Sequence, residues 1–137
     1  MIEIVFTIGM GLASTEAQAA MKIEQLASAI EARVINQAGK RNPEVGRAYA
    51  GSTMSDLIAN ASPQTLLVTS LNNPQLVRVA ELMDVPGICL VNGCEPAPEL
   101  ISHARGAGTA LLVSTSGLRE TLARITACLT IEEARQP

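Results

Sequence analysis

The fold is decided by three short runs, LLVTS at residues 66–70, GICLVN at 87–92 and ALLVS at 110–114. Each run is almost continuously apolar. Runs of this kind are typical of parallel strands that are covered by helices on both faces. We therefore predict that the three runs form the middle of a mostly parallel sheet.

Polar turn residues and then a helical pattern follow each run. After the first run, Asn73 and Pro74 predict an N-cap and a first helical position. The helix after the second run is expected to end near Arg105, before the GAG sequence at residues 106–108. The third helix carries one apolar face: Leu118, Leu122, Ile125 and Leu129. Three such strand-loop-helix units predict parallel strands with right-handed crossovers.

The chain upstream of residue 66 alternates in the same way. Short strands are expected at 33–36 and ending at Tyr49 to Gly51, with the stretch 36–47 between them as a loop because of its Gly, Asn and Pro residues. An earlier helix has its apolar face at Ile23, Leu26, Ala27 and Ile30. The predicted fold class is α/β, a three-layer α/β/α domain with a mostly parallel sheet.

The composition limits the classes of partner. A chain of 137 residues with 47% apolar residues fits one domain with a sizeable core, which must be aliphatic because there is no Trp and only one Phe and one Tyr. The net charge is −3 and the sequence has no basic stripe. We therefore expect no nucleic-acid partner.

The two ends are expected to lie outside the main domain. Residues 1–20 are predicted to be an extension or an extra strand at 2–8, residues 21–130 the domain, and 131–137 a tail. The start of the chain resembles a signal peptide in its apolar centre and its AQA ending, but Glu3 stands where a positive residue is typical. Its apolar run is far short of the roughly 20 residues that span a bilayer, so no membrane partner is expected.

The cysteines indicate the compartment and argue against a metal site. Cys89, Cys94 and Cys128 are an odd, irregularly spaced set, which is typical of a reducing environment, so we expect a cytoplasmic protein. Together with His103 they show no recognisable metal-ligand spacing. No metal and no cofactor are expected.

One edge of the predicted sheet is the candidate ligand site. Loops after parallel strands emerge at the carboxyl edge, where open α/β sheets bind ligands and helix N-termini favour anions. The candidate residues there are Ser70, Asn72, Asn73, Asn92, Gly93, Thr115, Ser116 and Gly117. Backbone amides around residues 92–93 and 116–117 are expected to hold a phosphate-bearing ligand, with Asn72 or Asn73 as side-chain donors.

The same residues also have a purely structural explanation. Asn, Ser and Gly are turn formers and helix caps, whatever the function of the chain. Neither of the two common phosphate-cradling motifs, G-x-x-x-x-G-K-[ST] and G-x-G-x-x-G, occurs in the sequence.

Three segments carry a resemblance to a known family. They are AGSTMSDLIANA (50–61), LLVTSLNNPQLVRVAELMDVPGICLVNG (66–93) and EPAPELISHARGAGTALLVSTSGLRETLARI (95–125). The chain resembles, over roughly residues 21–129, the DRTGG domain, which is related to the N-terminal domain of HPr kinase/phosphorylase. A helix with a Ser-Asp-Leu core follows the second strand in that family, as residues 55–57 do in this sequence.

The resemblance implies a fold and a role more than a site. The Asp-Arg pair and the Thr-Gly-Gly that name the family correspond to Leu71-Asn72 and to 91–93, where Gly93 alone remains. The family occurs beside or inside enzymes, including phosphotransacetylases and proteins with nucleotide-binding CBS domains. The resemblance therefore implies a regulatory module.

Asp56 is the last candidate ligand-binding residue. A carboxylate in the first turn of a helix is favoured by the helix dipole regardless of function. Because the same acid occurs in the family pattern, the alternative is that it holds a neighbouring loop or touches a ligand. We expect the structural role first.

We expect a non-catalytic regulatory or ligand-sensing module that forms a homodimer or larger homo-oligomer and binds a small anionic ligand or a nucleotide. One alternative is a docking adaptor for a partner enzyme. A second is a small enzyme that uses Cys94 and the Asn/Ser loops. His103 could pair with the Cys94 thiolate, but no third, orienting group is evident.

Overall fold

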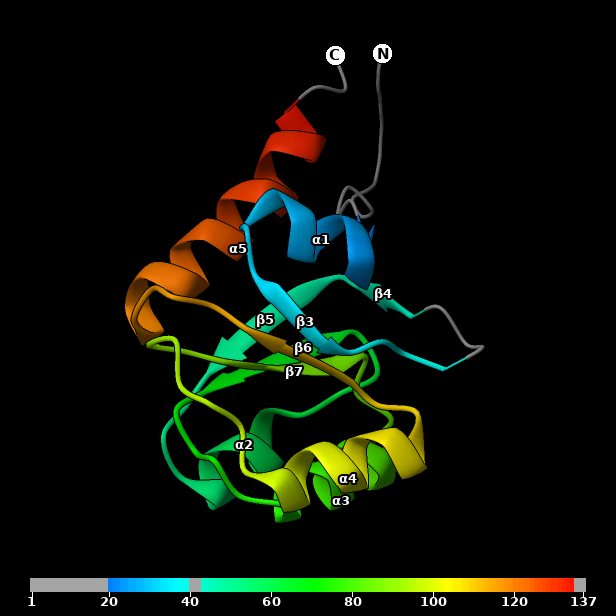
Figure 1. Cartoon of the computed structure of the whole chain (residues 1–137). Helices are drawn as coiled ribbons and strands as arrows, with labels where there is room; N and C mark the ends of the chain where they lie inside the picture. Colours follow the sequence, from blue (N-terminus) through cyan, green and yellow to red (C-terminus); the bar gives the residue numbers. More distant parts are fainter. Residues whose placement is uncertain (1–19, 40–42, 135–137) are drawn as a thin grey trace.

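The three apolar runs form neighbouring strands of one five-stranded sheet (Figure 1). The computed structural model describes residues 20–39 and 43–134. The strands follow one another across the sheet in the order β3-β8-β7-β6-β5, and β5 to β8 are mutually parallel. Their bounds are β3 Arg33–Asn36, β5 Arg47–Ala50, β6 Thr65–Thr69, β7 Gly87–Leu90 and β8 Ala110–Val113. Only β3, at one edge, runs antiparallel to its neighbour β8.

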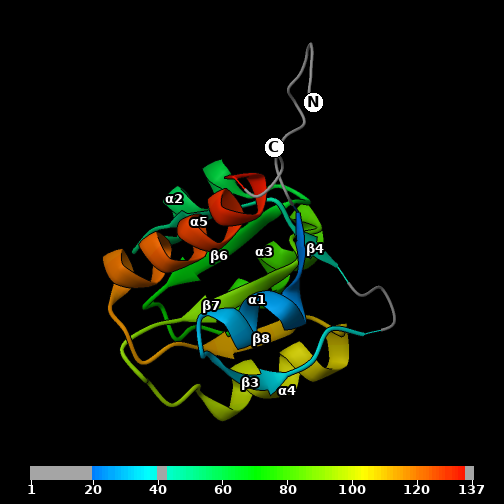
Figure 2. The same cartoon turned by 90° about the horizontal axis from the view of Figure 1, so that it is seen from above.

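Helices cover both faces of this sheet. Figure 1 shows α2 (Met54–Asn60), α3 (Gln75–Met83) and α4 (Pro98–Ala107) on one side of it. On the other side lie α1 (Ile23–Ala29) and α5 (Leu118–Ala134), which Figure 2 shows from above. The predicted three-layer α/β/α class with a mostly parallel sheet is confirmed.

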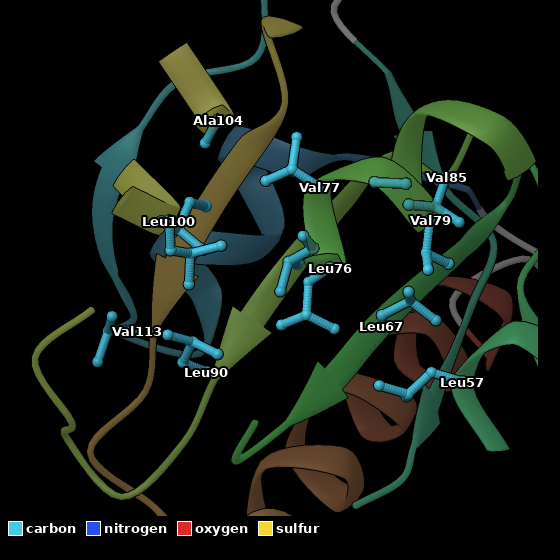
Figure 3. Close-up of a cluster of buried hydrophobic side chains, with 13 residues drawn as sticks. Leu57, Leu67, Leu76, Val77, Val79, Val85, Leu90, Leu100, Ala104 and Val113 are labelled. Atoms are coloured by element: carbon cyan, nitrogen blue, oxygen red, sulfur yellow. The ribbon is translucent and has the colours of Figure 1, made fainter. Parts of the chain in front are cut away.

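The side chains of β6, β7 and β8 alternate between two hydrophobic cores. One set of side chains points toward α2, α3 and α4: Leu67, Leu90 and Val113, which Figure 3 labels, and also Ile88 and Leu111. Toward α1 and α5 point Leu66, Val68, Cys89 and Leu112. All nine are at most 2% exposed. The continuous apolar runs of the sequence are thus explained by burial on both faces.

The predicted helix boundaries hold closely. Pro74 directly precedes α3 (Gln75–Met83) and already has helical backbone angles, φ −58° and ψ −22°. The side chain of Asn73 accepts a hydrogen bond from the amide of Gln75 (2.8 Å), so Asn73 acts as the capping side chain before Pro74. Gly108 ends α4 in the left-handed conformation, with φ 71°. The expected apolar face of α1 is buried, because Ile23, Leu26, Ala27 and Ile30 are at most 3% exposed.

The prediction of a continuous loop over residues 36–47 is wrong. β4 (Glu44–Val45) lies within it and pairs antiparallel with β2 (Met21–Lys22), forming a separate two-stranded sheet. Two-residue strands leave no periodic pattern, and this one is defined by a partner more than 20 positions away. The strand expected at residues 2–8 lies outside the described residues.

Because the central sheet packs closely against α1, substitution of Gly87 should destabilise the fold. A Cβ at Gly87 would stand 2.5 Å from Cδ1 of Ile23 and 3.0 Å from Cβ of Ala110. We expect Gly87→Ala to lower the free energy of unfolding by about 1–3 kcal/mol in urea denaturation, through overpacking.

The matched control for that substitution is Gly106→Ala. Gly106 lies inside α4, where a new Cβ meets nothing within 4 Å. This change should stabilise the protein by about 0.5–1 kcal/mol through helix propensity and the lower entropy of the unfolded chain. Equal effects of the two substitutions would contradict the predicted packing between β7 and α1.

Candidate functional site

The loops that follow the parallel strands meet at one edge of the sheet, as the sequence predicts. We call this edge the carboxyl edge; it comprises the segments 51–56, 70–74, 91–97 and 114–117. β3 also reaches it, because β3 is antiparallel and its first residue, Arg33, pairs with Val113 at the end of β8. The candidate residues of the sequence therefore lie along a common edge.

A tight turn follows β7. Asn92 and Gly93 both have positive φ, 63° and 62°, and the amide of Cys94 donates to the carbonyl of Val91 (3.4 Å). These angles are those of a type I′ turn, for which Asn-Gly is the preferred pair.

The turn after β7 is hydrogen-bonded to the loop after β8. The amide of Asn92 donates to the carbonyl of Ser116, and the amide of Gly93 donates to the carbonyl of Ser114, both at 2.8 Å. The amide of Ser116 donates to the hydroxyl of Ser114 (3.1 Å). Three amides that the sequence assigns to a ligand are therefore already bonded within the protein.

Buried hydroxyl groups hold the second of these loops. Ser114 and Thr121 are 2% and 0% exposed, and their hydroxyl oxygens lie 3.0 Å apart. The amide of Thr121 also donates to the carbonyl of Gly117 (2.9 Å). These hydrogen bonds fix the position of the loop relative to the first turn of α5.

Asn72 and Asn73 are likewise engaged. The side-chain amide of Asn72 donates to the carbonyl of Glu95 (2.8 Å), and its oxygen accepts from the amide of Ala97 (2.7 Å). Asn73 caps α3. These residues stabilise the loops, so a ligand at the carboxyl edge has to be held chiefly by other groups.

Several side chains at the carboxyl edge remain exposed. Ser70, Asn92 and Thr115 are exposed. The oxygen of the Asn92 side chain would lie 3.5 Å from a Cβ placed on Gly117, so this side chain reaches over the start of α5. The first amides of that helix have no partner within the helix itself.

Sequence reasoning missed Arg33. Its guanidinium lies 3.6 Å from the carboxylate of Glu95, in the loop that Asn72 also holds. The side chain remains 56% exposed, so part of the guanidinium is accessible. Only the antiparallel direction of β3 brings this cation to the carboxyl edge, and no local pattern in the sequence indicates that direction.

Asp56 lies in the first turn of α2, at the same edge. Its amide donates to the hydroxyl of Thr53, the N-cap residue (3.2 Å). In the described part of the chain the carboxylate accepts no hydrogen bond from a neighbouring loop. This position agrees with the role of stabilising the helix N-terminus.

The cysteine chemistry that an enzyme would need is not assembled. Partial burial, and after it the carboxylate of Glu95, raise the pKa of the Cys94 thiol above its ordinary value, which disfavours the nucleophilic thiolate. His103 lines a hollow between α3 and α4, and no hydrogen bond among the described residues joins it to Cys94. Burial raises the pKa of Cys89 to about 12.

Two further observations concern metals and membranes. Over residues 20–39 and 43–134, no three His, Cys, Asp or Glu side chains gather in a way that could hold a metal ion. No helix in this part of the chain is both long enough and apolar enough to cross a membrane.

Comparison with solved structures identifies a similar fold. The regulatory region of a Clostridium perfringens pyrophosphatase, made of CBS and DRTGG domains and solved with its activator diadenosine tetraphosphate, matches with a TM-score of 0.66. The identity is 13%, and the match covers 80% of this chain and 47% of that chain. The expected DRTGG-like fold is confirmed. No family model and no curated protein matches the sequence.

Proposed function

We propose that this chain is a non-catalytic regulatory module that senses a small anionic ligand or a nucleotide at its carboxyl edge. The observation that carries the proposal is the match to the regulatory region of the pyrophosphatase, which was solved with a nucleotide activator. The DRTGG resemblance of the sequence points to the same role. The chain spans about half of the matched structure, so the role is proposed for this module alone.

Side chains, and not a backbone cradle, hold the ligand in this proposal. Arg33 supplies a guanidinium, and the exposed side chains of Thr115, Asn92 and Ser70 supply hydrogen-bonding groups along the carboxyl edge. The helix dipole of α5 favours an anion at the same place. The amides of residues 92, 93 and 116 keep their bonds within the protein.

The alternatives receive less support. The small-enzyme hypothesis needs a nucleophile paired with a base, whereas the Cys94 thiol has a raised pKa and no hydrogen bond to His103 among the described residues. The three cysteines are free, in agreement with a reducing compartment such as the cytoplasm. The docking adaptor remains the account to prefer if no ligand binds.

Self-association completes the proposal. Leu82, on α3, is 78% exposed and Ile58, on the neighbouring α2, is 45% exposed, although both are large apolar side chains. The two helices contact each other on one face of the sheet. We infer that these two exposed side chains lie in an interface between two copies of the chain.

The ligand proposal is tested by substitution of Arg33. Nucleotides, including diadenosine tetraphosphate, and inorganic phosphate are titrated by calorimetry into wild type and Arg33→Gln. We expect the substitution to weaken binding about tenfold or more, because a guanidinium forms charge-assisted hydrogen bonds with phosphate. Stability should change by less than about 1 kcal/mol, since the Arg33–Glu95 pair is exposed.

The matched control for this titration is Arg78→Gln, which removes a cation from the exposed side of α3. It should leave binding unchanged. If no phosphate-bearing compound binds wild type at millimolar concentration, the ligand-sensing proposal is wrong and the docking adaptor becomes the better account.

The oligomer proposal is tested by light scattering at micromolar concentration. We expect wild type to have about twice the mass of the 14.3 kDa chain. Leu82→Glu should shift the mass to that of one chain, because a carboxylate would be placed in the interface. The control is Val34→Thr, at an exposed residue of β3, which should leave the mass at that of the dimer. A monomeric wild type would rule out self-association under these conditions.

A further inference from the structure

A second hollow, of about 250 Å³, opens between β5 and the C-terminal end of α2. The wall on the sheet side is formed by Arg47 and Tyr49 of β5 and by Thr65 of β6. The wall on the helix side is formed by Ala59, Asn60 and Ala61. Because β5 is the outermost strand of the sheet, the hollow lies at the sheet's free side.

The guanidinium of Arg47 is held in place within this hollow. Its Nε donates to the hydroxyl oxygen of Thr65 (3.2 Å), which lies 2.6 Å from the hydroxyl oxygen of Ser62. The backbone amide of Arg47 donates to the carbonyl of Gln64 (3.1 Å). Nε is used in this way, whereas the two terminal nitrogens bond to no residue within 20–39 and 43–134, so their hydrogens can bond a ligand.

No ion pair of the described residues includes Arg47. The ion pairs in this part of the chain are Lys22–Glu44, Arg33–Glu95 and Arg124–Glu120. The hollow therefore contains a positive charge that is oriented by the protein but not neutralised by it. A planar carboxylate suits such a guanidinium, because it can accept two parallel hydrogen bonds.

The helix wall has the opposite polarity. The last carbonyl groups of a helix have no partner within it, and they carry partial negative charge. In α2, the amide of Ala61 donates to the carbonyl of Ile58 at 3.4 Å, and the side chain of Asn60 donates back to the carbonyl of Asp56 (2.9 Å). Neither bond uses the carbonyl of Ala59 or of Asn60, and both residues line the hollow.

We propose that this hollow binds a small zwitterion, an α-amino acid, with its carboxylate on Arg47 and its ammonium group on the C-terminal carbonyls of α2. The volume is below the roughly 300–1,000 Å³ of pockets for drug-sized ligands, which favours a ligand smaller than a nucleotide. Tyr49, Ala59 and Ala61 also line the hollow, and their apolar side chains suit a ligand with a short side chain.

This site is separate from the carboxyl edge. Arg47 is the first residue of β5 and Thr65 is the first of β6, so the hollow lies at the opposite ends of these strands. The hollow and the carboxyl edge therefore share no residue, and binding at each can be measured by itself.

The test is an NMR titration of the full chain with the common α-amino acids, one at a time. We expect at least one of them to cause saturable shifts of the backbone amides of residues 47–49 and 59–61. Acetate and methylammonium, which each carry one of the two charges, should bind about tenfold or more weakly than that amino acid. Arg47→Gln should abolish the shifts, Arg47→Lys should weaken binding, and Arg78→Gln should leave it unchanged.

Several results would overturn the proposal. One is the lack of saturable shifts with any of the amino acids up to about 50 mM. Another is acetate binding as tightly as the amino acids, which would indicate a simple anion site. A third is a set of shifts centred on residues 92 and 115, at the carboxyl edge. If Arg47→Gln does not fold, the wild-type titrations with the amino acids, acetate and methylammonium decide the question by themselves.

Discussion

The structure depends on the burial of three neighbouring strands on both faces. In β6, β7 and β8, the apolar side chains enter one of two cores, alternately against α2, α3 and α4 and against α1 and α5. Burying one such aliphatic side chain contributes about 1.5–3 kcal/mol. A shift of one residue in register would exchange the two sets, so the burial also determines the register. Because the chain has only one Phe, one Tyr and no Trp, the packing of aliphatic side chains stabilises the fold.

The same arrangement determines what the carboxyl edge can do. Parallel strands end together, and the loops that follow β7 and β8 then lie close enough to bond through Asn92, Gly93 and Ser114. These bonds stabilise the loops and use the amides that a phosphate-binding loop would direct toward its ligand. In the proposed function, recognition at this edge therefore falls to side chains, among which Arg33 is the cation contributed by the antiparallel strand.

The sequence predicts the parts of the fold that have a local physical cause. Continuous apolar runs indicate β6, β7 and β8, and Asn73 and Gly108 mark helix ends because capping chemistry is local. The pairing of β2 with β4 and the direction of β3 depend on distant partners, which no short pattern encodes. For that reason the sequence does not place Arg33 at the carboxyl edge. It predicts that the loops after the parallel strands lie at this edge, but not that the amides of residues 92, 93 and 116 bond within the protein. The assignment of Asn72 to a ligand shows the same limit, since its bonds to residues 95 and 97 arise only in the folded chain.

The central claim is that the carboxyl edge is closed by its own hydrogen bonds and that ligands meet side chains there. Hydrogen exchange of individual backbone amides by NMR tests it most directly. The amides of Asn92 and Gly93 should exchange about 100-fold or more slowly than in an unstructured chain, like that of Ser114, which donates to Leu90 within the sheet. Addition of nucleotide or phosphate should not change these rates beyond the general stabilisation of the fold. Rapid exchange in the free protein, with protection that appears only when a phosphate-bearing ligand is added, would show a backbone cradle and contradict the account.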